Sequence, residues 1–248
     1  MKRITLLLMT VLLAAACTKV TPETQIRRIS DYFASAEDVH SARLNQYAGE
    51  KKADYLTLVL GKDLKAADIW TLEHEDGSTG ALVAEFPGRK NERAELTLIS
   101  APLDDPTACA TVLAVMEAFR ECKIRPKNTI RALFYDPAQD SSGRSILSDV
   151  AEEMRESSEF FEFNLVLTSR DSIPARTFIL EEKPVFAKKM LEVIPPYFTQ
   201  LGDYRFEQGP YPAAGWPMSG STYRYGIEAG TSREDAAAVT AFSYLLNF

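Results

Sequence analysis

Acidic side chains follow two of the apolar stretches in this sequence. Asp104 and Asp105 come directly after "LISAPL", and Asp136 and Asp140 come after "TIRALFY". Carboxylates that meet at one place bind a divalent metal ion, and such an ion activates water for hydrolysis. His74 could add an imidazole ligand. One interpretation is therefore a metal-dependent hydrolase that uses these four aspartates and His74.

The other interpretation of the same residues is structural. Asp104 or Asp105, just before Pro106, would form a helix N-cap with proline in the first turn. The acids of the loop "DPAQDSSG" would be solvated. The whole chain has two histidines, and both precede residue 81. His40 is interpreted as a solvated helix residue and His74 as part of an acidic turn. Carboxylates without imidazoles prefer calcium or magnesium to zinc.

Short apolar segments alternate with amphipathic ones along most of the chain. The predicted strands cover residues 81–86, 96–100, 128–135, 163–169, 176–180, 204–207 and 223–229. Helices are predicted at 106–122, in a stretch that ends near 154, at 184–198 and at 232–248, and residues 23–60 predict two more. This alternation is typical of an α/β domain with a largely parallel sheet, in which ligand sites lie beyond the carboxyl ends of the strands.

The composition bounds the function classes. The 248 residues are 46% hydrophobic and 25% charged, which is ordinary for one globular domain. A net charge of -7 with no cluster of lysine or arginine argues against a nucleic-acid partner. Cys109 and Cys122 fall on one predicted helix roughly 20 Å apart, too far for a disulfide. They are predicted to be buried free thiols.

The first residues predict export. "MKRITLLLMTVLLAAACTK" has a basic start, an apolar run too short to span a bilayer, and three alanines before Cys17. This arrangement resembles the lipobox of bacterial lipoproteins, in which the cysteine is lipidated and becomes the mature N-terminus. The alternative is an ordinary signal peptide cut nearby. We therefore expect a signal peptide over 1–17, a membrane anchor at Cys17 in the cell envelope, and a single domain over 18–248 whose residues 18–60 are helical.

An aromatic-rich segment is the remaining candidate for binding. In "YRFEQGPYPAAGWPMSGSTYRY", Tyr211, Trp216 and Tyr223 are candidate ligand contacts, because aromatic rings bury large areas at recognition surfaces. The alternative is that they brace a long loop. A serine nucleophile at Ser219 or Ser221 is disfavoured, because G-x-S-x-G is absent and no histidine follows.

Two long stretches carry a resemblance to a known family. "ALVAEFPGRKNERAELTLISAPLDD" and "DPTACATVLAVMEAFRECKIRPKNTIRALFYDPAQDSSGRS" resemble the exported two-zinc aminopeptidases, a family that also includes glutaminyl cyclases and the transferrin receptor ectodomain. The matching features are the Pro87–Gly88 turn, the acid pair that opens a helix, and Gly143 with Ser145. The resemblance covers about two-thirds of the chain, and it implies a three-layer α/β sandwich with helices on both faces of a mixed, mostly parallel sheet.

The residues that carry the family's chemistry are not matched. Pro102 stands where the first histidine ligand is expected, Val166 where a later aspartate is expected, and Gly230 where the last histidine is expected. Ala138 and Gln139 replace the glutamate pair, with Asp140 one position late. The usual loop between the first ligands and the Asp104–Asp105 pair is also missing.

These departures imply a degenerate member of the family. It would have no catalytic residues and no zinc cofactor, and it would bind a peptide, a glycan or an envelope protein, as the transferrin receptor resembles the family without cleaving peptides. The alternative is an active metallo-aminopeptidase with relocated, carboxylate-rich ligands.

Overall fold

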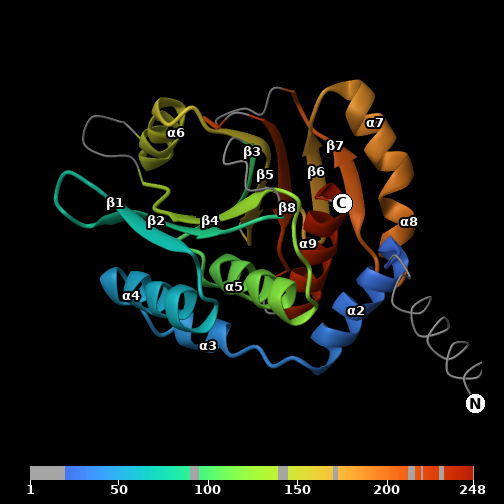
Figure 1. Cartoon of the computed structure of the whole chain (residues 1–248), viewed down its shortest axis with the longest axis horizontal. Helices are drawn as coiled ribbons and strands as arrows, with labels where there is room; N and C mark the ends of the chain where they lie inside the picture. Colours follow the sequence, from blue (N-terminus) through green and yellow to red (C-terminus); the bar gives the residue numbers. More distant parts are fainter. Residues whose placement is uncertain are drawn as a thin grey trace, which may run out of the picture.

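The computed structural model describes residues 20–89, 95–138, 145–169, 173–211, 216–218, 220–228 and 232–247. Within these ranges, one eight-stranded sheet has the strand order β1-β2-β4-β3-β5-β8-β6-β7. Helices lie on both of its faces, so the sheet is the middle of three layers (Figure 1). The predicted α/β sandwich with a mixed, mostly parallel sheet is confirmed.

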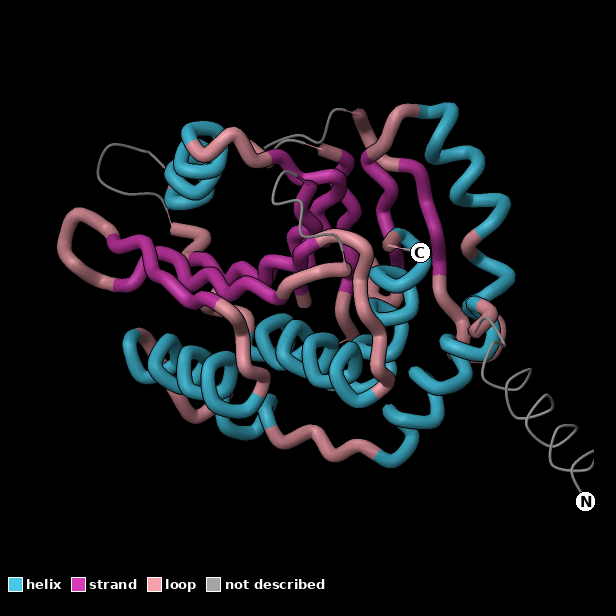
Figure 2. Tube along the Cα trace, in the orientation of Figure 1, coloured by secondary structure: helices cyan, strands magenta, loops and turns pink. Residues whose placement is uncertain are grey.

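The strands and helices follow the predicted order along the chain (Figure 2). The strands are β1 (Asp68–Glu73), β2 (Thr79–Phe86), β3 (Glu95–Pro102), β4 (Thr129–Tyr135), β5 (Phe160–Thr168), β6 (Thr177–Glu181), β7 (Arg205–Gln208) and β8 (Ser221–Gly226). The helices are α2 (Pro22–Ser35), α3 (His40–Leu44), α4 (Glu50–Leu58), the π-helical turn η1 (Val59–Asp63), α5 (Pro106–Glu121), α6 (Ile146–Glu156), α7 (Pro184–Val193), α8 (Pro195–Phe198) and α9 (Ser232–Leu246).

The centre of the sheet is parallel and its flanks are antiparallel. Strands β4, β3, β5 and β8 run parallel to one another, whereas β2 is antiparallel to β4 and β6 is antiparallel to β8. Every residue of β4 is buried, which explains its nearly continuous apolar sequence "TIRALFY". The parallel centre brings the carboxyl ends of four strands to the same edge.

The two faces of the sheet bury cores of different size. The larger core lies between the sheet and α2, α4, α5 and α9, and the smaller one lies under α6. In Figure 1, α6 lies by itself on its face of the sheet, over the end that β1, β2 and β4 form. The sheet is therefore covered on both faces, and one of them is covered less completely.

Two helical segments differ from the sequence-based expectation. Residues 184–198 form α7 and α8 and not one helix, because Pro195 has no N–H to donate to the preceding turn. Residues 23–60 form three helices and the start of a π-helical turn where two helices were predicted. Leu58, at the end of α4, is an apolar residue of this segment that is exposed to solvent. Strand β1, with its mostly polar exposed side, is not predicted from the sequence.

The interpretation of His40 as a solvated residue is wrong. Its ring is buried between α4 and α5, where Nδ1 lies 2.9 Å from the Tyr55 hydroxyl and Nε2 lies 3.2 Å from a Glu117 carboxylate oxygen. These partners satisfy both ring nitrogens, which is what burial of a polar ring requires. His40 thus ties the N-terminal helices to α5 and lies away from the strand ends.

The cysteines agree with the prediction. Cys109 lies inside α5 and Cys122 caps its C-terminus, and both are buried free thiols. Burial raises the pKa of the Cys122 thiol from 9.0 to about 11, and it raises the pKa of Tyr32 from 10.0 to about 12.

Among the described residues, no helix is both long and apolar enough to cross a bilayer.

These raised pKa values predict alkaline destabilisation. The folded chain holds the two protons more tightly than the unfolded chain, so their stabilisation is complete below about pH 9 and is lost as the pH rises through the folded values. We expect the urea midpoint to be flat up to pH 8 and to fall between pH 9 and 12. Cys122→Ala should remove part of the fall between pH 9 and 11 and keep the part due to Tyr32. A midpoint that does not change up to pH 12 would contradict this assignment.

Candidate functional site

The candidate site is the sheet edge at which the parallel strands end. Pro102 of β3 pairs with Tyr135 of β4, and Thr168 of β5 pairs with Gly226 of β8. The Leu103 N–H donates to the Tyr135 carbonyl at 2.7 Å, and the Ile227 N–H donates to the Thr168 carbonyl at 2.8 Å, which extends the pairing by one residue. This is the edge at which open α/β sheets bind their ligands.

Asp105 is an almost fully enclosed acid at this edge. The residue is 2% exposed. Its Oδ1 accepts the Ala108 N–H at 3.0 Å and the Ser169 hydroxyl at 2.8 Å, and its Oδ2 accepts the Ser169 N–H at 2.6 Å. The first bond caps α5, with Pro106 in the first turn as predicted. Both carboxylate oxygens are therefore committed to protein donors, while Asp104 beside it is exposed.

Pro102 and its neighbours are also held by the chain's own hydrogen bonds. The Pro102 carbonyl accepts the Asp105 N–H at 3.0 Å and the Cys109 thiol at 3.2 Å. The buried Lys52 of α4 reaches the same turn and donates from Nζ to the Leu103 carbonyl at 2.8 Å. Burial raises the pKa of the Cys109 thiol, the Lys52 ammonium opposes that rise, and Asp105 adds to it. A lysine thus supplies positive charge next to the acid pair.

The other positions that the family resemblance singles out fall on this edge only in part. Val166 is buried within β5, where it pairs with Ser100 of β3 and Arg224 of β8, and its side chain has no atom that could bind a metal. The Ala138 N–H donates to an Asp136 carboxylate oxygen at 2.9 Å, in the loop after β4. Gln139, Asp140 and Gly230 lie outside the described residues.

His74 and Asp136 are brought together by the fold. The His74 Nε2 lies 3.4 Å from an Asp136 carboxylate oxygen, although the two residues come from the turn after β1 and the loop after β4. The Asp136 N–H donates to the Gly80 carbonyl at 2.7 Å, which places the pair beside the start of β2. Among the acids and the histidine considered as relocated metal ligands, His74 and Asp136 are the two from distant segments that lie close together within the described residues.

The donors within the described residues do not by themselves make a zinc site. A structural or catalytic zinc site needs three or four converging nitrogen, sulfur or carboxylate ligands. In the described part of the chain, no three His, Cys, Asp or Glu side chains lie close enough to hold a metal together. Asp105 has both oxygens bonded to protein donors, and Pro102 and Val166 offer no ligand atom.

The three candidate aromatic contacts have different surroundings. Tyr223 is buried in the main core, with its ring 6.2 Å from that of Phe163 and its hydroxyl 3.4 Å from a Glu182 carboxylate oxygen. Its assignment as a ligand contact is corrected to core packing. Burial accordingly raises the pKa of its hydroxyl. Trp216 packs edge-on against Tyr135, at 6.0 Å between ring centres, whereas Tyr211 is exposed. The alternative expectation, that these rings brace the segment, fits the packing of Tyr223 and Trp216 better than contact with a ligand does.

Ser169 and Lys52 are two residues of this edge that the sequence does not predict. Ser169 directly follows the apolar run "FNLVLT" of β5, so its place at a strand end was a usable signal. Lys52 carries no such signal, because it lies on a helix more than forty residues before the turn that it contacts.

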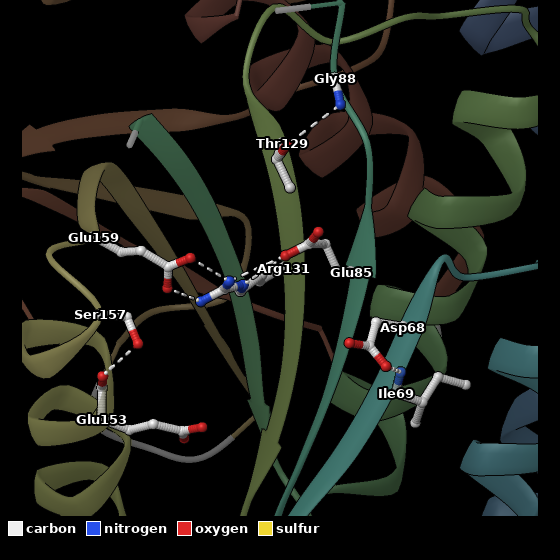
Figure 3. A network of polar contacts seen from close by, with 9 residues as sticks. All are labelled: Asp68, Ile69, Glu85, Gly88, Thr129, Arg131, Glu153, Ser157 and Glu159. Atoms are coloured by element: carbon white, nitrogen blue, oxygen red, sulfur yellow. Dashed lines mark hydrogen bonds and ion pairs between the residues drawn. The ribbon is translucent and has the colours of Figure 1, made fainter. Parts of the chain in front are cut away.

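A second polar cluster lies on the α6 face of the sheet, away from this edge. The buried Arg131 of β4 forms ion pairs with Glu85 of β2 at 3.0 Å and with Glu159 before β5 at 2.6 Å (Figure 3). Its guanidinium carbon lies 5.1 Å from the centre of the Trp70 ring. The sequence gives no sign of this cluster, because its members come from separate strands and a loop. Arg131, Glu85 and Glu159 line a pocket of about 410 Å³, together with Trp70 and residues of α6.

Solved structures with the same arrangement of strands and helices exist. An aminopeptidase of Legionella pneumophila, LapA, superposes with a TM-score of 0.63 at 10% identity, covering 92% of this chain and 76% of that one. This chain has the zinc-exopeptidase fold. A glutaminyl cyclase of an Acidobacteriales bacterium gives a TM-score of 0.56 at 13% identity, covering 93% of this chain and 96% of that one.

A chain described as a zinc-dependent exopeptidase from Bacteroides vulgatus shares the zinc-exopeptidase fold, with a TM-score of 0.52 at 14% identity and coverage of 91% of this chain and 96% of that one. No model of a protein family matches the sequence, and no curated protein matches it either. Identities this low establish the fold alone. Whether this chain can bind a metal or catalyse hydrolysis depends on the residues at the sheet edge.

Proposed function

We propose that this protein is a catalytically inactive member of the zinc-exopeptidase fold that binds a ligand in the bacterial cell envelope. The observation that carries the proposal is the state of Asp105. Its carboxylate accepts three hydrogen bonds from Ala108 and Ser169, so it is a structural acid that caps α5 and ties it to the end of β5. These three bonds use most of the carboxylate's lone pairs, and a metal ion at this position would compete with them.

The other positions support the same conclusion. The resemblance places Pro102 and Gly230 where histidine ligands are expected, and Val166 where an aspartate is expected. Gln139 stands at the position of a glutamate, and an amide cannot take a proton from a metal-bound water. Since the losses fall on several separate elements, a single substitution would not restore the chemistry.

We propose further that this protein is an exported lipoprotein. Cys17 would carry the lipid and anchor the domain at the outer membrane or the periplasmic face of the envelope, with a peptide, a glycan or an envelope protein as its ligand. The support is the arrangement of the first residues, with a basic start, a short apolar run and alanines before the cysteine. The net charge of -7 is against nucleic acid as the ligand.

One contact favours a second candidate function, an active metallo-aminopeptidase with relocated ligands. His74 and Asp136 lie 3.4 Å apart at the sheet edge, and a neutral imidazole next to a carboxylate is a pair that zinc enzymes use. This candidate needs further ligands, such as Asp140 in the loop that follows Asp136.

Metal content and hydrolysis separate the two functions. Purified protein is incubated with zinc, dialysed and analysed for metal per chain, and aminoacyl p-nitroanilides are tested as substrates with and without zinc. We expect well below one zinc per chain and no hydrolysis above the rate of a heat-denatured sample. His74→Ala and Asp136→Asn are the matched variants and should change neither result. A full equivalent of zinc that His74→Ala removes would contradict the inactive assignment and support the second candidate.

A further inference from the structure

Helix α7 is attached to the domain by a narrow strip. Ala187 is its one fully buried residue, Met190 and Leu191 are half-buried against the main core, and Ile194 continues the strip into α8. These positions are spaced by three and four, so they lie on one side of the helix. The rest of α7 faces solvent at the β7 edge of the sheet (Figure 1).

The solvent side of α7 carries large apolar side chains. Val185 is 79% exposed, Phe186 is 56% exposed and Val193 is 50% exposed. Phe186, Lys189 and Val193 are spaced at i, i+3 and i+7 and share a face. Several exposed apolar residues on one helical face are typical of a surface that another phase or molecule covers.

The charge of this segment differs from that of the whole chain. Residues 183–198 contain Lys183, Lys188 and Lys189 and one acid, Glu192, whereas the protein carries a net charge of -7. An anionic surface therefore repels most of the domain and attracts this segment. Lysines that flank apolar side chains are the composition of helices that lie in a membrane interface.

The start of the described chain is on the same side. Helix α2 contacts α8, and Figure 1 shows the beginning of α2 next to the end of α8, in line with α7. Val20 is three residues after Cys17, and an extended chain spans at most roughly 11 Å over that interval. A lipid on Cys17 would thus hold the bilayer surface within reach of α7 and α8.

We propose that α7 lies on the surface of an anionic phospholipid bilayer and fixes the orientation of the anchored domain. The inference rests on the proposed lipidation of Cys17. The apolar side chains Val185, Phe186 and Val193 would enter the headgroup region, and Lys188 and Lys189 would contact lipid phosphates. A lipid on Cys17 would hold the domain at the bilayer without fixing its orientation, and a second contact of this kind would fix it.

The test uses the lipidated full chain in vesicles of phosphatidylethanolamine and phosphatidylglycerol. An environment-sensitive dye is attached at Phe186→Cys or at Leu58→Cys. Leu58 is the matched control because it is also 56% exposed, and Figure 1 shows its helix α4 at the opposite end of the molecule. Buried Cys109 and Cys122 stay unlabelled, because burial raises the pKa of both thiols.

We expect blue-shifted emission and quenching by nitroxide-labelled lipid at position 186 and neither at position 58. The double variant K188Q/K189Q should lower the ratio of docked to undocked protein roughly 30-fold at low ionic strength. Equal signals at 186 and 58 would overturn the docking of α7 and leave this face for a protein partner. The mass of Cys17 is measured on the same sample, and an unmodified cysteine would overturn the anchoring and, with it, this inference.

Discussion

Replacing Asp105 by alanine is expected to lower the free energy of unfolding by about 3 kcal/mol. The variant removes the N-cap of α5, which costs about 1 kcal/mol. It also leaves the Ser169 N–H and hydroxyl without their acceptor, and each unsatisfied donor costs at least about 1 kcal/mol. The loss should be visible in urea denaturation followed by circular dichroism.

Two further variants make this prediction specific. Asp105→Asn keeps a carbonyl oxygen for the cap and should cost less than Asp105→Ala. Asp104→Ala changes the neighbouring exposed acid and should cost under about 0.5 kcal/mol. If Asp105→Ala were no less stable than Asp104→Ala, the carboxylate would not be a structural acid, and the main support for the inactive assignment would be lost.

Replacing Arg131 by methionine is expected to destabilise the fold by about 3–5 kcal/mol. The guanidinium is the shared partner of Glu85 and Glu159, and all three side chains are largely buried. Without it, two carboxylates remain in a poorly solvated place with no compensating charge. The packing of Arg131 on Trp70 is also lost, although methionine refills much of that volume.

The triple variant R131M/E85Q/E159Q tests the cause. It removes all three charges and should recover most of the lost stability, because the penalty comes from the unpaired acids. Arg120→Met is the matched control, since the Arg120–Glu121 ion pair is exposed and should contribute no more than about 1 kcal/mol. A triple variant as unstable as the single one would show that lost packing, and not unpaired charge, causes the defect.

The sequence by itself determined the local features of this protein. Patterns within a few residues predict the alternation of strands and helices, the capping of α5 by one acid of the Asp104–Asp105 pair, and the burial of Cys109. The same is true of the lack of a side-chain metal ligand at Pro102, because a proline side chain has no donor atom in any fold. These features depend on bonds and contacts between near neighbours, which composition and spacing record directly.

Only the tertiary structure decided which distant residues meet. Ser169 contacts Asp105, Lys52 contacts the turn at Leu103, and His74 contacts Asp136 because the sheet order brings separate segments to one edge. The burial of His40 and Tyr223 and the exposure of α7 have the same origin, since a helix or strand can be covered on either side. Local patterns cannot encode this choice, because it depends on how all the apolar faces are buried together.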